Sequence, residues 1–206
     1  MTNSCKQALI FAENQRLETE RLVLRPVTLA DALEMFAYAS DEKMARYVFP
    51  VHQSLQDTKE SIATYFMAAP FGKYGLIVKE TGQFIGTIDL RVNASHANGE
   101  LGYALSRTFW GQGYMPEAAS ELLRFGFEKL DLIRIGAVHD QDNPKSGRVM
   151  EKIGMKKEGK IPNARIVKGK ISTDIVYGIT IEAWQQRIEQ VNKLKGTNQN
   201  VNVYKD

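Results

Sequence analysis

The feature that most constrains the fold is a glycine loop in front of a helical pattern. The loop consists of Trp110, Gly111, Gln112, Gly113, Tyr114 and Met115, and Pro116 follows it. Small or apolar residues then recur at spacings of three and one through residues 119–130, which predicts one face of an α-helix. Proline suits the first helical turn, and the glycines let several N–H groups face one anion at the positive end of the helix. The stretch therefore predicts a phosphate-binding loop, although an ordinary turn is the simpler alternative.

Two better-known phosphate motifs are absent. No Gly-x-x-x-x-Gly-Lys-[Ser/Thr] run occurs, so the loop is not a P-loop. The dinucleotide fingerprint would require a third glycine where Pro116 stands. The loop therefore suits the phosphates of some other nucleotide-bearing cofactor.

Composition narrows the class of protein. A chain of 206 residues with 43% hydrophobic content suits one soluble globular domain, and its net charge of +3 is spread too evenly to suggest a nucleic-acid partner. Cys5 is the only cysteine, which excludes an intrachain disulfide. His52, His96 and His139 are scattered and are expected at the surface or at caps, so no metal is expected. The apolar run 8–12 is too short for a signal or membrane helix, which predicts a cytoplasmic protein without a membrane partner.

Periodicity and caps predict an α+β fold with a mixed, mostly antiparallel sheet of about seven strands flanked by helices on both faces. Strands are expected at 21–25, 74–79, 83–92, 99–105, 134–138, 155–161 and 173–181. Helices are expected at 28–40, 55–68, 116–130, 143–153 and around Trp184, Ile188 and Val191. Residues 1–16 are interpreted as a loose N-terminal extension, 17–195 as a single domain and 196–206 as a disordered tail.

Four blocks in order resemble a known family. They are Leu17 to Pro26, Glu100 to Tyr114, Asp142 to Met155, and Gly169 to Asp174 with Tyr177 and residues 182–184. Residues 17–187 resemble the GNAT superfamily of N-acetyltransferases, and within it the ribosomal-protein-alanine, or Rim-type, branch. The resemblance implies a GNAT-like sheet and a single acetyltransferase domain.

The resemblance also implies acetyl-CoA as co-substrate. The backbone from Trp110 to Met115 would hold the pyrophosphate. The pantetheine arm would lie along Tyr103, Ala104 and Leu105 like an added strand, where this strand separates from 134–138. Asn143 would hydrogen-bond the pantetheine amides, although a helix cap before Pro144 is an equal alternative.

Two residues are candidates for the chemistry. Ser146 is implied as the acid that protonates the leaving thiolate, because the superfamily's usual tyrosine is replaced by Met150, which cannot donate a proton. The alternative for Ser146 is a hydroxyl in the first turn of a helix. Glu100 is implied as the base, directly or through water, and its alternative is an exposed charge. An α-amine with a pKa near about 8 would need little help from a base.

These features predict direct acetyl transfer to a primary amine, with a protein N-terminal α-amine, as on a ribosomal protein, as the first candidate. A polyamine or aminoglycoside is the second candidate. A non-catalytic acetyl-CoA-binding module is the third, and the replacement by Met150 favours it. Cys5 lies outside the matched region, which argues against a covalent acetyl-enzyme. The Trp184 face would pack on its own core or, in a homodimer, on a second subunit.

Overall fold

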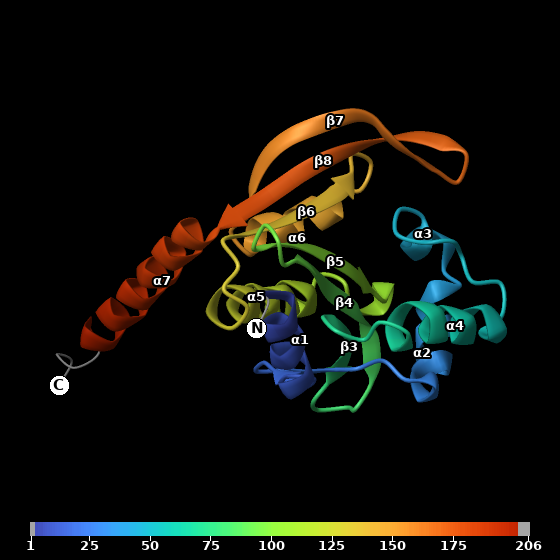
Figure 1. The fold of residues 1–206 in the computed structure, drawn as a ribbon, viewed down its shortest axis with the longest axis horizontal. Coiled ribbons are helices and arrows are strands. Elements are labelled where there is room, and N and C mark those ends of the chain that lie inside the picture. The colour runs from blue at the N-terminus through green and yellow to red at the C-terminus, as the bar shows by residue number, and fades with distance from the viewer. Residues whose placement is uncertain (1–2, 202–206) are drawn as a thin grey trace.

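The computed structural model describes residues 3–201, which form an eight-stranded sheet with helices on both faces (Figure 1). The helices are α1 (Asn3–Glu13), α2 (Ala32–Ala39), α3 (Glu42–Ala45), α4 (Leu55–Ser61), α5 (Tyr114–Glu128), α6 (Pro144–Lys152) and α7 (Ile181–Val201). Short 3₁₀ turns lie at Leu29–Asp31 and Arg107–Phe109, and a π-helical turn at Ile62–Met67 continues α4. The strands are β1 (Leu17–Glu18), β2 (Leu22–Arg25), β3 (Lys73–Val78), β4 (Phe84–Asn93), β5 (Asn98–Leu105), β6 (Arg134–Asp140), β7 (Lys156–Val167) and β8 (Lys170–Thr180).

The strands lie in the order β1-β2-β3-β4-β5-β6-β8-β7. Every neighbouring pair is antiparallel except β5 and β6, which are parallel. The predicted α+β fold with a mixed, mostly antiparallel sheet is confirmed. The additional strand is β1, whose two residues are too few for alternation to show in the sequence.

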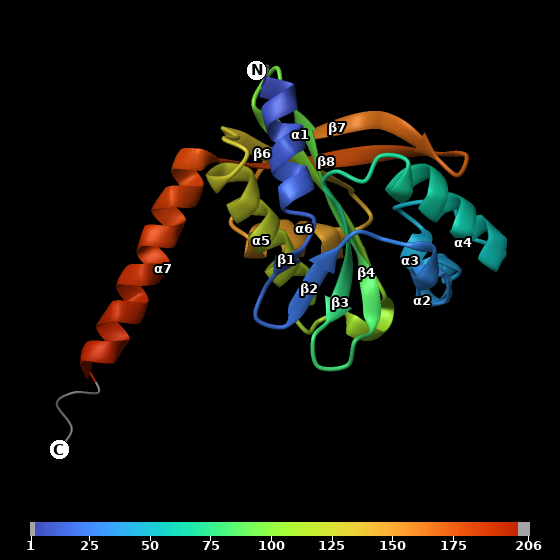
Figure 2. The ribbon, with the colours of Figure 1, turned by 60° about the horizontal axis from the view of Figure 1, so that its bottom comes forward.

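Two apolar cores lie on opposite faces of the sheet. Figure 2 shows α1 and α5 on one side, and α2, α3 and α4 on the other. The α5 core buries Leu122 and Phe125 almost completely, and the opposite core buries Met35 and Ile62. Two capping boxes start elements of the second layer: Thr28 with Asp31 begins the 3₁₀ turn before α2, and Ser54 with Asp57 begins α4.

Strands β5 and β6 form a fork in the middle of the sheet. They pair in parallel over only four positions, from Asn98 with Arg134 to Leu101 with Ala137. Beyond Leu101, β5 stays paired with β4 as far as Leu105 but has no register partner in β6. The predicted separation of these two strands is therefore present, and it leaves a main-chain edge inside the sheet.

Both ends of the described chain differ from prediction. Residues 3–13 form the docked helix α1 in place of a loose extension, because Phe11 is buried against Phe125 and the Gln7 side-chain amide donates to the Leu130 carbonyl at 3.2 Å. Helix α7 continues to Val201, where a disordered tail was expected from residue 196. The rest of that tail, residues 202–206, lies outside the described residues.

The start of α7 packs on its own chain. The Trp184 ring lies 5.4 Å from the ring of Phe127, centroid to centroid, which fits the first of the two packings expected for this face. Further along, α7 projects away from the sheet (Figure 1), and Ile188 and Val191 are partly exposed. Across residues 3–201, no helix combines the length and apolar character needed to cross a bilayer.

Candidate active site

The glycine loop has the backbone that a phosphate site requires. Gly111 and Gly113 have φ values of 79° and 83°, a region that glycine enters without steric cost. Gly113 is the N-cap of α5, and no side chain caps the helix start. A Cβ on Gly111 would meet no atom within 4 Å, so the loop is open on that side. Helix α5 begins at Tyr114 and thus places Pro116 in the first turn, as expected.

The loop lines a cleft of about 800 Å³. Among the described residues that line the cleft, Asp142 is the acidic one, and the basic ones are Lys43, Arg107, Lys145, Arg148 and Lys152. The Lys145 ammonium lies 4.3 Å from the centre of the Trp110 ring, which holds this cation beside the loop. The cleft is therefore suited to a ligand with several negative charges.

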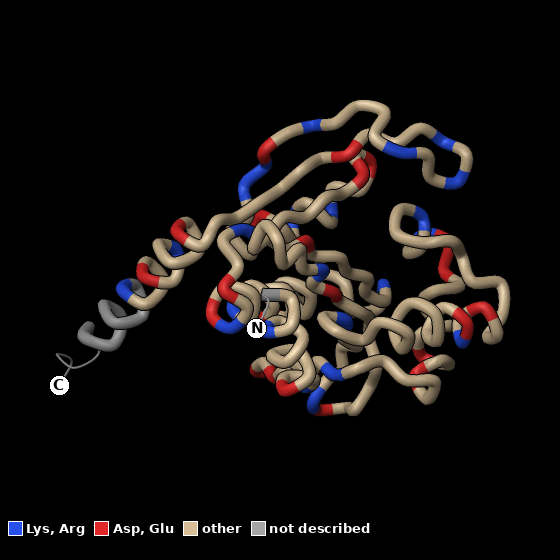
Figure 3. Tube along the Cα trace, viewed as in Figure 1, with Lys and Arg blue, Asp and Glu red and all other residues tan. Residues whose placement is uncertain are grey.

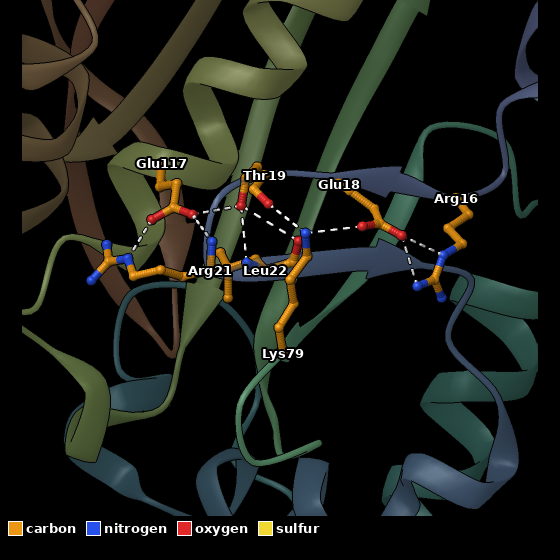
Figure 4. Close-up of polar contacts among 7 residues, drawn as sticks. All are labelled: Arg16, Glu18, Thr19, Arg21, Leu22, Lys79 and Glu117. Carbon is orange, nitrogen blue, oxygen red and sulfur yellow. Dashed lines mark hydrogen bonds and ion pairs between the residues drawn. The ribbon is translucent and has the colours of Figure 1, made fainter.

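A network around Glu117 fixes the loop to the start of the sheet (Figure 4). The Glu117 carboxylate accepts from the Thr19 hydroxyl at 2.5 Å, from the Arg21 backbone N–H at 2.8 Å and from Arg21 Nε at 2.7 Å. Arg21 Nη1 in turn donates to the Gln112 carbonyl at 3.0 Å, and the guanidinium lies over the Tyr114 ring. The short hairpin of β1 and β2 thus holds the glycine loop in place.

The open edge of β5 begins at the same cleft. Tyr103, Ala104 and Leu105 all line it, as predicted for the strand that would pair with a pantetheine arm. The Trp110 indole N–H donates to the Leu105 carbonyl at 2.8 Å, so this carbonyl already has a partner. The edge available to a ligand is therefore centred on residues 102–104.

Asn143 and Ser146 come together with Tyr103 where β5 meets α6. Asn143 precedes α6, but its side chain makes no capping hydrogen bond and lines the cavities on both sides of the fork. Ser146 Oγ lies 3.0 Å from the Tyr103 hydroxyl, which itself donates to the Ser146 carbonyl at 3.0 Å. Burial raises the pKa of Tyr103, so this hydroxyl stays protonated. The sequence did not indicate this hydroxyl pair, since the two residues lie on different elements.

A second cavity of about 430 Å³ lies on the other side of the fork. Aromatic side chains line much of it, namely Tyr38, Tyr47, Phe49, Tyr65, Phe66 and Tyr103. Its carboxylates are Asp89, Glu100 and Asp140, and its guanidinium groups are those of Arg91 and Arg165. The two cavities share Tyr47, Val48, Tyr103, Ala104, Asn143 and Ser146. A ligand in the cleft and a ligand in this pocket would therefore meet beside Asn143 and Ser146.

Glu100 lies in the pocket wall in an ion pair. Its Oε1 is 2.6 Å from Arg91 Nη2, and its side chain is 51% exposed. Asp89, which the sequence analysis missed, is far more enclosed, with 13% of its side chain exposed. Its signal in the sequence was the alternation of Thr87, Asp89 and Arg91 with apolar residues along β4. The role of Glu100 as a base stays a prediction.

The histidines partly differ from expectation. His139 is buried in the pocket wall, not at the surface, because its ring packs on Tyr177 and its Nδ1 lies 2.7 Å from the Asp140 carbonyl oxygen. His52 is half-buried, with Nδ1 2.8 Å from the Thr58 hydroxyl. Within the described part of the chain, no three His, Cys, Asp or Glu side chains lie close enough together to hold a metal ion.

Comparison with known proteins agrees with this architecture. Residues 21–156 match the family model of the acetyltransferase (GNAT) domain, so the chain belongs to the GNAT family. The uncharacterized N-acetyltransferase YoaA of Bacillus subtilis (strain 168) is 33% identical over 168 residues, which cover 79% of this chain and 95% of YoaA. The crystal structure of a GNAT-family acetyltransferase from Bacillus anthracis has a TM-score of 0.75 at 27% identity and covers 81% of this chain and 99% of that protein.

A more distant relative has a named acceptor. The ribosomal protein uS5-alanine N-acetyltransferase of Escherichia coli (strain K12) is 24% identical over 182 residues, covering 82% of this chain and 92% of that enzyme. The resemblance to the ribosomal-protein-alanine branch is thus confirmed at low identity. From these relatives and the fold, the chain is an N-acetyltransferase.

Proposed function

We propose that the chain transfers an acetyl group from acetyl-CoA directly to the α-amine of a protein N-terminus. The observation that carries the proposal is the meeting of a cationic cleft and an aromatic, carboxylate-containing pocket at Asn143 and Ser146. One cavity suits a polyanionic donor and the other suits a cationic acceptor, so both substrates could be bound at once.

The residues of the cleft fit acetyl-CoA. The backbone from Trp110 to Met115 would receive the pyrophosphate at the start of α5, where Gly111 leaves open space. The basic side chains of the cleft would neutralise the remaining phosphate charge. Main-chain groups of residues 102–104 would pair with the amides of the arm, and the Asn143 side chain lies close enough to the fork to bind them as well.

Acetyl-CoA, when bound, supplies an acetyl group activated as a thioester. Asn143 and the β5 edge would hold the reacting carbonyl at the fork, which gives the rate advantage of proximity. Ser146 Oγ would turn from Tyr103 to donate a proton to the departing sulfur. The Tyr103 hydroxyl would still hold the Ser146 main chain in place, because it donates to the Ser146 carbonyl.

An α-amine is the acceptor that makes the smallest demand on the site. With a pKa near about 8, roughly a tenth of it is already neutral at pH 7, whereas a lysine or polyamine amine near about 10.4 is almost wholly charged. The relative that acetylates the alanine of ribosomal protein uS5 supports the same choice. A pocket that is open to solvent also suits the end of a long chain.

The test is a thiol-release assay with acetyl-CoA and a panel of amines. The panel comprises peptides with N-terminal alanine or serine, the same peptides with a blocked N-terminus, spermidine and an aminoglycoside. We expect release with the free peptides and none with the blocked ones. A higher kcat/KM for spermidine or the aminoglycoside would identify a small-molecule enzyme instead. Binding of acetyl-CoA without release in any reaction would indicate a non-catalytic module.

A further inference from the structure

Asp89 lies on β4, level with the fork between β5 and β6. Asp89 lines the second cavity of about 430 Å³, here called the acceptor pocket. In the pairing of adjacent strands, Asp89 on β4 is in register with Gly102 on β5. Gly102 is the first residue of β5 beyond Leu101, where the pairing with β6 ends. Asp89 is therefore level with the point at which β5 and β6 separate, one strand away from the open edge at which the reacting thioester would lie.

Glu100 lies on β5 itself, but before the point at which β5 separates from β6. It is in register with Arg91 on β4 and also with Gly136 on β6, so it belongs to the stretch in which the sheet is still closed. Arg91 bridges the two carboxylates, since its Nη1 pairs with Asp89 and its Nη2 pairs with Glu100. Glu100 thus shares the Arg91 guanidinium with Asp89.

The surroundings of Asp89 provide a positive charge, the Arg91 guanidinium, and a hydroxyl donor, Tyr65. Tyr65 donates its hydroxyl to Asp89 Oδ2 at 3.2 Å, and its ring also faces the Lys73 ammonium at 3.8 Å. A side chain on Gly102 would be excluded, because its Cβ would come within 3.0 Å of both Asp89 oxygens. Arg91 Nη1 would lie 2.7 Å from the same Cβ, so the absence of a side chain on Gly102 lets the paired Asp89 and Arg91 lie over β5 where its pairing with β6 ends.

We propose that Asp89 binds the ammonium group of the acceptor and takes one proton from it, an inference that rests on the acetyl transfer proposed above. The freed nitrogen lone pair then attacks the thioester carbonyl carbon. As the C–N bond forms and the C–S bond breaks, Ser146 protonates the departing sulfur, and the second proton of the nitrogen restores the Ser146 hydroxyl. The products are an amide, a thiol and one proton, which Asp89 returns to solvent. Glu100 is then a positioning residue, which acts by holding Arg91.

The charge balance at Asp89 suits this task. Burial raises the pKa of its carboxyl above the ordinary aspartate value, and Glu100 acts in the same direction, while Arg91, Tyr65 and Lys73 oppose the shift. A carboxylate with a raised pKa is a better proton acceptor than an exposed one. The acid limb of the parent's pH–rate profile should accordingly lie above the ordinary aspartate range.

The test compares two matched, nearly isosteric variants, Asp89→Asn and Glu100→Gln. For the best peptide of the panel, Asp89→Asn should lower kcat/KM by about 10²- to 10⁴-fold at neutral pH, and the loss should shrink as rising pH neutralises the amine. Glu100→Gln should lose less than tenfold and should keep the shape of the parent's pH profile. A pH-dependent loss confined to Glu100→Gln would overturn the proposal in favour of Glu100 as the base.

A binding measurement keeps the proposal testable apart from catalysis. Alaninamide is titrated into each protein saturated with CoA, and the binding is followed by NMR shifts. The parent and Glu100→Gln should bind it comparably, and Asp89→Asn at least tenfold more weakly. Equal binding by a folded Asp89→Asn would overturn the proposal even if no amine of the panel is acetylated. Acetyl-CoA affinity and the circular dichroism spectrum verify folding, and Asp89→Glu, which restores the charge, serves as the second variant if Asp89→Asn does not fold.

Discussion

The Glu117 network offers a sharp test of how the donor loop is held. In the variant Glu117→Ala, the Thr19 hydroxyl, the Arg21 backbone N–H and Arg21 Nε all lose their shared acceptor. Hydrogen bonds to charged groups contribute about 1.5–3 kcal/mol each, but water can replace part of the loss at the Arg21 guanidinium, whose side chain is 41% exposed. We therefore expect the free energy of unfolding to fall by about 3 kcal/mol, equivalent to about 6–12 °C in Tm for a chain of this size.

Urea denaturation followed by circular dichroism measures this change, and Glu128→Ala is the matched control. Glu128 lies on the same helix but pairs only at the surface, with Arg124 at 2.8 Å, so its loss should cost less than about 0.5 kcal/mol. Acetyl-CoA should also bind Glu117→Ala more weakly, because Arg21 would no longer fix the Gln112 carbonyl. If Glu117→Ala and Glu128→Ala are equally stable, the reasoning is refuted.

The pH dependence gives an independent check on the same carboxylate. Burial by itself would raise the pKa of Glu117, but the hydrogen bonds from Thr19 and Arg21 bring it below the ordinary glutamate value. The folded state therefore favours the ionised form of Glu117. Its contribution to the free energy of unfolding is present above the pKa that Glu117 has in the unfolded chain, and it is lost as pH falls through the pKa that Glu117 has in the folded protein. The stability difference between parent and Glu117→Ala should be constant above about pH 5 and narrow below it.

Three further substitutions test other parts of the molecule. Gly113→Val should weaken acetyl-CoA binding at least tenfold, as measured by calorimetry. The control Gly82→Val has the same positive-φ strain in a turn outside the cleft and should leave the acetyl-CoA affinity unchanged. Equal affinities of the two variants would contradict the placement of the pyrophosphate. Ser146→Ala should lower kcat by about 10²- to 10⁴-fold with little change in the acetyl-CoA KM, and a loss below about threefold would leave Ser146 as a helix residue only. Phe11→Ala should reduce the free energy of unfolding by about 2–4 kcal/mol, against little change for the half-exposed Leu9→Ala, and equal values would argue against docking of α1.

The parts of the fold that the sequence predicted are those encoded locally. Caps such as Thr28 with Asp31 lie within one turn of the helix that they start, and alternation marked strands such as β4 without any knowledge of their neighbours. Helix α1 was missed because its burial depends on Phe125, which is more than a hundred residues away. Its own sequence has only a weak helical periodicity.

The candidate site likewise contains features that the sequence predicts and features that only the folded chain shows. The glycine loop was predictable because its residues are consecutive and its helix follows at once. The cations of the cleft were not, since Lys43 and Lys152 come from α3 and α6 and looked evenly spread along the chain. Asp89 gained its position from strand register, which sets Gly102 opposite it, and a single sequence does not give register. Figure 3 shows Lys and Arg positions interspersed with Asp and Glu positions along the folded chain.

The fork between β5 and β6 has a consequence for how freely this site can change. A row of main-chain N–H and C=O groups recognises a ligand by geometry, and almost any amino acid presents the same row. The main-chain pairing itself would therefore tolerate many residues at Ala104, with proline as the exception because it lacks the N–H. Gly102 and Tyr103 have less freedom, because Asp89 and Arg91 lie over Gly102 and the Tyr103 hydroxyl bonds Ser146. The groups on the pocket side of the same strands have no such freedom, because each acts through its side chain. Substrate choice can thus drift from one acceptor to another while the donor remains the same.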